Sequence, residues 1–372
     1  MVTTRVVPLA RPYLDEREEE LVIEVLRSGQ LSLGPVGPQF EQAFAETVGT
    51  RFAVACSSGT TGLHAALHRL GVGPGDEVVT SSFSFISSAN VILHERATAV
   101  FADIDERTFN IDPAALEAAI TPRTRAIIPV HIFGYPCEID EIGAIARRHG
   151  LPVVEDACEA LGATIRGKAV GTHGNVAVYG FYPNKQMTTG EGGMITTDDE
   201  DVQRELRSLV NQGRSDDGDW LVHQRVGFNY RMDDLSAALG LAQLEKLPML
   251  LQRRREVAGR YGELLAGIPG VELPYDGRHE RSWFVYPIRL TAGIDRPRVI
   301  AAMAERGVAT RPYLPAIHLQ PDYRRRFGYR EGMLPVTERV SRSTLALPFF
   351  VQLDDEDLAH VAAALREAIE GL

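Results

Sequence analysis

The sequence predicts an α/β protein in which a mostly parallel sheet lies between layers of helices. Short apolar runs alternate with helical segments as far as about residue 250. Runs such as 126–130 are apolar at nearly every position, which is typical of strands buried on both faces of a parallel sheet. Beyond residue 250 the alternating units become shorter, which predicts a smaller C-terminal α/β domain.

Composition sets the size of the core and excludes several classes of partner. The 372 residues, 44% of them hydrophobic, allow a large core and two domains. We expect a large domain over 1–250 and a small one over 251–372, with the N-terminal segment as a candidate to pack on the small domain. The net charge of −11 argues against nucleic acid or an anionic membrane as the main partner.

Cysteine usage and hydropathy indicate the compartment. The three cysteines show no CxxC spacing, so we expect neither a zinc site nor a disulfide framework, and a reducing cytoplasm is the simplest compartment. No apolar run approaches the length of a membrane span, and the N-terminus lacks the apolar segment of a signal peptide. A cytoplasmic protein without a metal site is therefore expected.

The first elements read as two helices and then a strand–turn–helix unit. Residues 15–28 form an amphipathic helix capped by Asp15, and a proline-glycine turn leads to a second helix within 34–49. Residues 52–56 form a strand, and the small residues 57–62 precede a helix that ends at Gly71. Free N–H groups and the helix dipole would make that turn an anion cradle. An ordinary βα loop with a Ser/Thr cap is the alternative.

Strand and helix then alternate, and polar or aromatic residues follow several strand ends. The expected elements after the turn at 73–79 are a strand with Phe83 and Phe85 at its end, a strand at 99–101, helices at 113–120 and 139–149, and strands at 126–130 and 153–154. Ligands of such sheets bind at the carboxyl ends of the strands. Phe83 or Phe85 is a candidate to stack on a planar ring, with plain core packing as the alternative.

His131 and Asp156 also follow strand ends. A carboxylate in an apolar setting requires a cation, and a protonated pyridine nitrogen is such a cation. Pairing it with Asp156 would keep the ring of pyridoxal phosphate an effective electron sink. The alternative role of Asp156 is a helix N-cap.

The segment VAVYGFYPNKQMTTGEGGMI carries the best candidate for a nucleophile. Its first residues form a buried strand from Val176, Pro183 ends the strand, and Lys185 follows before a glycine-rich loop. Burial of an amine there would favour its neutral, nucleophilic form and suit it to a Schiff base. A solvated surface lysine is the alternative.

The remaining chain reads as a helix at 199–210, a polar loop at 211–225 that we expect to be mobile, and a helix that Asp233 caps. The C-terminal elements are strands at 282–290 and 345–347 and helices at 296–306 and 354–369. The arginines at 253–255 are predicted to lie on a solvated helix face.

Taken together, these motifs resemble the DegT/DnrJ/EryC1/StrS family of sugar aminotransferases, which are fold type I (aspartate aminotransferase-like) pyridoxal phosphate enzymes. The resemblance covers nearly the whole chain and rests on GPVGPQFE, ACSSGTTGLHAAL, GPGDEVV, PVHIFG, EDACEALGA, FYPNKQMTTGEGG, GFNYRMDDLSAALGLAQLEKL and RPYLPAIHLQP. It implies a seven-stranded type of sheet in the large domain.

The resemblance also implies residue roles. Lys185 would form the internal aldimine and move the proton, Asp156 would pair with the pyridine nitrogen, and Phe85 would stack on the ring. Gly59 and Thr60 would hold the phosphate, which Asn229 would reach from the neighbouring subunit of a homodimer. Tyr313 and His318 would line the sugar-nucleotide side. The strand-end residue His131 is a further candidate for a substrate contact.

Two positions depart from the family pattern. Gly180 stands where many members have a phosphate-binding serine, so a backbone N–H or a water would have to replace that hydroxyl. Glu159 stands where the family has glutamine or histidine near the ring hydroxyl. A glutamate there would either add a negative charge or be protonated.

The implied reaction moves an amino group from glutamate to a nucleotide-linked keto-sugar by a ping-pong mechanism, with pyridoxamine phosphate as the intermediate. A sugar dehydratase of the same family is one alternative, but its lysine is replaced, typically by histidine. A non-catalytic cofactor-binding regulator is a second. A transaminase of a non-sugar cyclic ketone, such as an inosose, is a third.

Overall fold

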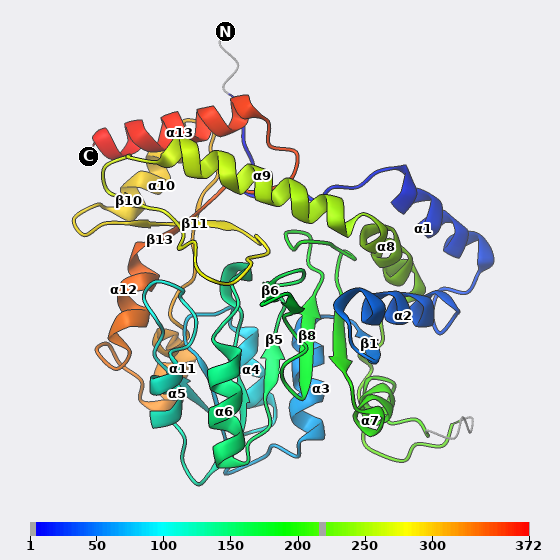
Figure 1. Cartoon of the computed structure of the whole chain (residues 1–372). Coiled ribbons are helices and arrows are strands. Elements are labelled where there is room, and N and C mark those ends of the chain that lie inside the picture. Colours follow the sequence, from blue (N-terminus) through cyan, green and yellow to red (C-terminus); the bar gives the residue numbers. More distant parts are fainter. Residues whose placement is uncertain (1–4, 216–220, 372) are drawn as a thin grey trace.

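The central element of the molecule is a sheet of seven strands. Figure 1 shows it below the long helices α9 (Leu247–Leu265) and α13 (Asp355–Glu370). The computed structural model describes residues 5–215 and 221–371. In this part of the chain one four-stranded sheet has the order β1 (Phe52–Cys56), β9 (Gly193–Thr197), β8 (Val176–Gly180) and β5 (Val154–Asp156). A three-stranded sheet has the order β3 (Thr98–Ala102), β2 (Glu77–Ser81) and β4 (Thr124–Ile128).

The two sheets continue each other. Parallel bridges join Ile127 to Val153 and Val130 to Asp156, so β4 lies beside β5. Only β9 runs antiparallel to its neighbours among these described strands. The prediction of a mostly parallel sheet is confirmed, and β9 is the strand that the sequence analysis missed.

Helices cover both faces of the sheet because alternate strand residues point to opposite sides. On one face, Val54, Val178 and Ile195 share a core with α3 (Gly59–Arg69), α4 (Ser87–His94) and α7 (Glu200–Val210). On the other face, Ala55 and Tyr179 pack against α2 (Val36–Val48) and α8 (Asp234–Glu245). Further along that face lie α5 (Pro113–Ala118) and α6 (Ile139–His149).

The helix ends follow the capping rules. α1 (Glu16–Ser28) begins with a capping box in which Asp15 accepts the N–H of Arg17 and Glu18 accepts that of Asp15. It ends at Gly29, whose φ of +72° is a left-handed conformation that favours glycine. The predicted strand at 52–56 and helix at 139–149 have the bounds of β1 and α6. α3 ends at Arg69, and its C-cap is Leu70 rather than the predicted Gly71.

The C-terminal region forms a second, antiparallel sheet. Its strands have the order β10 (Val271–Glu272), β11 (Tyr286–Leu290), β13 (Thr344–Leu347) and β12 (Arg311–Pro312). The long helix α9 (Leu247–Leu265) continues from α8 toward this sheet, where it shares a core with α10 (Arg296–Glu305) and α13 (Asp355–Glu370) (Figure 1). The N-terminal segment joins the same core, because Val7 pairs with Val308.

Part of the C-terminal region returns to the large sheet. This segment includes η2 (Ile317–Leu319), α11 (Pro321–Phe327) and α12 (Pro335–Ser343). Its residues Ile317 and Tyr323 pack in the core beneath α3 and α4. The domain boundary near residue 250 stays a prediction, and a division there would separate this segment from the large-sheet core that Ile317 and Tyr323 join.

Small elements complete the described chain. They are the two-residue strands β6 (Thr164–Ile165) and β7 (Lys168–Ala169) and the 3-10 turn η1 (Ile132–Gly134). The middle of the loop that was expected to be mobile, residues 216–220, lies outside the described residues. No helix of the described ranges combines the length and the apolar character that a membrane crossing requires.

Candidate active site

A cavity of about 440 Å³ lies at the carboxyl edge of the large sheet. The loops after β1, β2, β4, β5 and β8 line it, and residues of the C-terminal region close it. This is the place where open α/β sheets bind their ligands. The lining residues include Ser58, Gly59, Thr60, Phe85, Ser88, Asp156, Cys158, Glu159, Gly180, Tyr182, Lys185, Phe284 and Tyr313.

Lys185 reaches this cavity from the loop after β8. Its side chain is only 14% exposed, and its Nζ lies 3.7 Å from Glu159 Oε1. The same nitrogen lies 4.0 Å from the centroid of the Phe284 ring. The loop is fixed locally by the N–H of Lys185, which donates to the carbonyl of Tyr182 at 2.9 Å. The amine of Lys185 thus faces the cavity with one carboxylate and one ring face as neighbours, where it can reach a ligand.

Asp156 ends β5 and points into the cavity as a hydrogen-bonded acceptor. Ser88 Oγ donates to its Oδ2 at 2.7 Å, and the N–H of Cys158 donates to its Oδ1 at 3.1 Å. No helix begins after Asp156 in the described structure, so the alternative role as a helix cap is not realised. The side chain is buried and has no cationic partner among the described residues. A buried carboxylate of this kind is suited to a cationic group of a ligand.

The first turn of α3 forms the other wall. Ser58 caps this helix by accepting the N–H of Thr61 at 3.1 Å, which leaves the N–H groups of Gly59 and Thr60 without an acceptor in the described structure. Thr60 Oγ1 donates to Ser87 Oγ at 2.8 Å. A Cβ atom at Gly59 would lie 2.6 Å from Cys158 Sγ, so only glycine leaves this wall open. The two N–H groups and the helix dipole fit a phosphate.

The two departures from the family pattern both face this cavity. A Cβ atom at Gly180 would lie 3.3 Å from the Cβ atom of Cys158, so the thiol occupies space beside the position of the missing serine. Glu159 is buried, and its Oε2 accepts the N–H of Phe133 at 2.8 Å. Burial raises the pKa of Glu159, although the Lys185 ammonium acts in the opposite direction.

The structure corrects two of the expected substrate contacts. His131 is fully buried, with its Nε2 at 3.1 Å from Glu155 and its Nδ1 accepting the N–H of Cys137. His318 is equally buried between Ser82 and Glu338. Neither histidine lines the cavity. The ring nitrogens of both residues contact neighbouring groups inside the core.

The other expected contacts fall in different places. Phe85 lines the cavity, and 60% of the residue is exposed at its mouth. Tyr313 lines the same cavity, and burial raises the pKa of its phenol to about 12. Asn229 is exposed and lies outside the cavity of its own chain. Its predicted contact with a neighbouring subunit is not tested by a single chain.

Sequence reasoning missed the residue that anchors the lysine loop. Arg254 was predicted to lie on a solvated face, but it is only 5% exposed and donates to the carbonyl of Lys185 at 2.7 Å. The spacing of apolar residues along α9 indicates that Arg254 lies on the buried face of the helix. Arg254 follows Leu250 by four positions and precedes Val257 and Ala258, which are all buried.

Comparisons with known proteins agree with this geometry. Residues 12–366 match the model of the DegT/DnrJ/EryC1/StrS aminotransferase family. The chain is 42% identical to the spore coat polysaccharide biosynthesis protein SpsC of Bacillus subtilis, covering 98% of this chain and 97% of that protein. It is also 42% identical to the GDP-perosamine synthase of Caulobacter vibrioides, covering 98% of each.

A solved structure extends the comparison to the fold. The pyridoxal phosphate form of Spr1654 from Streptococcus pneumoniae, described as a sugar aminotransferase on a provisional basis, is 28% identical over 99% of each chain and superposes with a TM-score of 0.93. The expected fold and family are thereby confirmed. The chain belongs to the DegT/DnrJ/EryC1/StrS aminotransferase family and is a pyridoxal phosphate-dependent aminotransferase.

Proposed function

We propose that this aminotransferase moves an amino group from glutamate to a nucleotide-linked keto-sugar in amino-sugar biosynthesis. The observation that carries the proposal is the placement of Lys185 and Asp156 in one cavity beside the open N-terminus of α3. The substrate class is supported by the relatives, of which one is named a GDP-perosamine synthase and one a spore coat polysaccharide biosynthesis protein.

The residues present fit pyridoxal phosphate. Gly59 and Thr60 would hold its phosphate through the free N–H groups at the first turn of α3, and Asp156 would accept a hydrogen bond from its ring nitrogen. Phe85 would cover the ring from the mouth of the cavity. When bound, the cofactor supplies an electron sink that stabilises negative charge on the substrate carbon.

Lys185 would act as the general acid and base in both half-reactions. Its amine would hold the cofactor, and in each half-reaction it would be the group that takes up and gives back the proton at the substrate carbon. The Phe284 ring and the Glu159 carboxyl, at 4.0 and 3.7 Å from Nζ, restrict where that amine can move. A lysine at this position argues against a dehydratase activity.

We propose further that two copies of the chain complete each site. Asn229 is exposed on the segment after the described part of the polar loop, and it would reach the phosphate of the partner subunit. Phe85 and Tyr182 are large apolar side chains that are more than half exposed at the mouth of the cavity. A second subunit would shield them from water.

The first test is the visible absorption spectrum of the purified protein with pyridoxal phosphate, before and after glutamate. We expect a band from the lysine-bound cofactor that glutamate bleaches and that is absent from Lys185→Ala. The matched control is Lys168→Ala, which removes an exposed lysine outside the cavity and should keep the band. A band that glutamate leaves unchanged would contradict the amino donor.

The second step identifies the acceptor. A nucleotide-linked keto-sugar added to the glutamate-treated protein should restore the band and release an amino-sugar nucleotide. If a free cyclic ketone of the inosose type restores the band and the keto-sugar does not, the proposed substrate class is wrong.

A further inference from the structure

Arg254 is a buried cation that contacts main-chain carbonyls. Its Nη2 donates to the carbonyl of Lys185 at 2.7 Å, and its Nη1 donates to the carbonyls of Trp283 and Phe284 at 3.2 Å each. Its neighbours in sequence behave differently. Arg253 and Arg255 are exposed and form ion pairs with Glu256 and Glu280. Only the central arginine of the three is directed inward.

The charge of Arg254 has no carboxylate partner in the part of the chain that the structure describes. Its Nε is buried without a hydrogen-bond acceptor, and the ring of Phe349 lies 5.6 Å from its Cζ. Burial lowers the pKa of Arg254 to about 10, so the group keeps its proton at neutral pH. A buried, unpaired cation costs free energy of folding, so stability alone is a poor reason for its presence.

The carbonyls that Arg254 binds belong to the two segments that meet at the reactive amine. Lys185 carries the amine, and Phe284 supplies the ring that lies 4.0 Å from it. The lysine loop lies after β8 in the large sheet, whereas Phe284 precedes β11 in the C-terminal sheet. One guanidinium therefore holds both main chains, and its planar fork fixes their relative position.

The residue after the lysine reinforces the same junction. Gln186 is buried, and its Nε2 donates to the carbonyl of Glu159 at 2.6 Å and to Ser282 Oγ at 3.0 Å. Two consecutive residues of the lysine loop, Lys185 and Gln186, are thus tied to the segment at 282–284. Of the two side chains that tie these main chains together, Gln186 is neutral and Arg254 carries a charge.

We propose that Arg254 is a positioning residue that fixes the backbone of Lys185 against Phe284, so that the amine projects into the cavity beside Glu159. This inference rests on the proposed role of Lys185 as the amine that binds the cofactor. Without the three carbonyl contacts, the lysine loop and the 283–284 segment would keep the neutral contacts of Gln186 but lose the charged ones. Misplacement of a reacting group by about 1 Å costs up to about 100-fold in rate.

The test measures how fast Lys185 reacts, separately from turnover. The apo-protein is mixed with pyridoxal, which lacks the phosphate and so does not depend on the α3 cradle. Borohydride stops the reaction at intervals, and mass spectrometry quantifies the labelled peptide that contains residue 185. The same proteins, loaded with pyridoxal phosphate, give kcat and KM for glutamate. The variants are Arg254→Met, Arg254→Lys and the exposed control Arg253→Met.

We expect Arg254→Met to slow labelling of Lys185 and to lower kcat by about 10- to 100-fold, with KM for glutamate unchanged. Arg254→Lys should recover part of the rate, because an ammonium can donate to these carbonyls but cannot span all three. Arg253→Met should match the wild type. A folded Arg254→Met protein that is labelled at the wild-type rate would overturn the proposal.

Two complications are covered by the design. If Arg254→Met does not fold, Arg254→Lys decides: slowed labelling at an unchanged unfolding midpoint supports the role, and an unchanged rate overturns it. If the wild type transfers no amino group from glutamate, the proposed function fails, but the labelling rates at Lys185 still decide the role of Arg254.

Discussion

At the scale of single residues, Glu159 is the side chain that most distinguishes this cavity. It lies between a cation and a main-chain donor, because Lys185 Nζ is 3.7 Å from one oxygen and the N–H of Phe133 is 2.8 Å from the other. These contacts favour the carboxylate, whereas burial favours the neutral acid and has the larger effect on the pKa. Ionisation of Glu159 therefore lowers the free energy of unfolding of the apo-protein, and this effect depends on pH.

The variant Glu159→Gln tests this effect. The pKa of Glu159 in the folded protein lies above its usual value of 4.5, so the folded state holds the proton more tightly than the unfolded chain. Wild-type stability should fall, relative to Glu159→Gln, as the pH rises from about 4.5 through the folded pKa. The difference is about 1.4 kcal/mol for each unit by which the pKa is raised. Urea unfolding of both apo-proteins across this range measures it.

Two outcomes would contradict the expected pH dependence of the stability difference. A difference in unfolding free energy that stays constant with pH would show that Glu159 titrates at its ordinary value. A difference that changes in favour of the wild type as the pH rises would show that the contacts with Lys185 and Phe133 outweigh burial.

Residue chemistry at strand ends was predictable, but side-chain direction was not. Lys185 and Asp156 were expected in the cavity and line it. His131 and Asp156 were both expected beside a strand end, but Asp156 is the last residue of β5, whereas His131 lies beyond the end of β4. The His131 ring turns into the core toward Glu155 and Cys137. The alternation of side chains between the two faces of a sheet stops where the strand ends. Beyond that point, the sequence position of a residue does not determine the direction of its side chain. That direction depends on the loop geometry, which is a tertiary property.

At the scale of elements, the first turn of α3 links stability to cofactor binding. Ser58 accepts the N–H of Thr61, and this cap leaves the N–H groups of Gly59 and Thr60 directed at the cavity. Loss of the cap would fray the turn that forms the cradle.

We therefore expect Ser58→Ala to lower the free energy of unfolding by about 1 kcal/mol and to weaken binding of pyridoxal phosphate. The matched control is Asp199→Ala, which removes the cap of α7 far from the cavity lining. It should cost similar stability without changing cofactor affinity. Urea unfolding and equilibrium titration with pyridoxal phosphate measure the two effects. Equal loss of affinity in both variants would contradict the role of the cap.

Element boundaries were predictable where local chemistry marks both ends. α6 has acidic residues in its first turn, basic residues in its last turn and Gly150 in a left-handed conformation after it, and its predicted bounds are confirmed. β9 was missed because Gly193–Thr197 reads as the end of a glycine-rich loop. Its pairing partners are β1 and β8, so only the assembled sheet identifies it as a strand.

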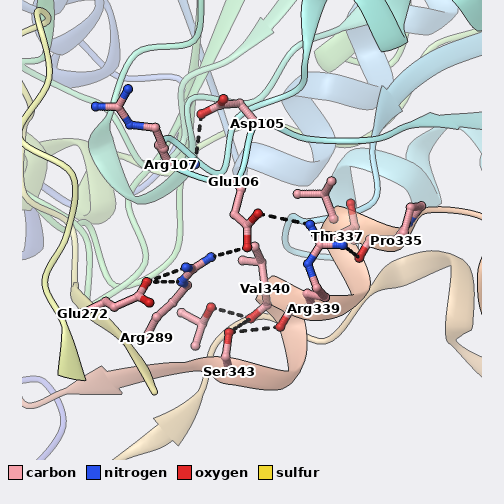
Figure 2. A network of polar contacts seen from close by, with 12 residues as sticks. Asp105, Glu106, Arg107, Glu272, Arg289, Pro335, Thr337, Arg339, Val340 and Ser343 are labelled. Carbon is pink, nitrogen blue, oxygen red and sulfur yellow. Dashed lines mark hydrogen bonds and ion pairs between the residues drawn. The ribbon is translucent and has the colours of Figure 1, made fainter. Parts of the chain in front are cut away.

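At the scale of the whole molecule, the C-terminal region is tied to the large sheet by a polar network (Figure 2). Glu106, in the loop after β3, contacts Arg289 of β11 at 2.9 Å and Arg339 of α12 at 3.1 Å. Asp103 in the same loop accepts the N–H and the hydroxyl of Thr337 at the first turn of α12. The sequence predicted the strands β3 and β11 but neither α12 nor these contacts, because long charged side chains have no periodicity that identifies their partners.

The variant Glu106→Gln tests how much this network contributes. Hydrogen bonds from Arg339 and Arg289 lower the pKa of Glu106, so its contribution is present above about pH 4.5 and is lost as the pH falls through the folded pKa. Because the carboxylate is partly exposed, we expect a loss of less than about 1 kcal/mol at neutral pH. About 1 M salt should screen most of it.

The measurement is urea unfolding of wild type and variant at low and high salt and at neutral and acid pH. Glu24→Gln, at an exposed position of α1, is the control and should change nothing. If the stability difference for Glu106→Gln persists at high salt and low pH, the loss arises from packing rather than from charge. The C-terminal region would then be held to the large sheet by its apolar contacts, with Ile317 and Tyr323 in the shared core as the residues responsible.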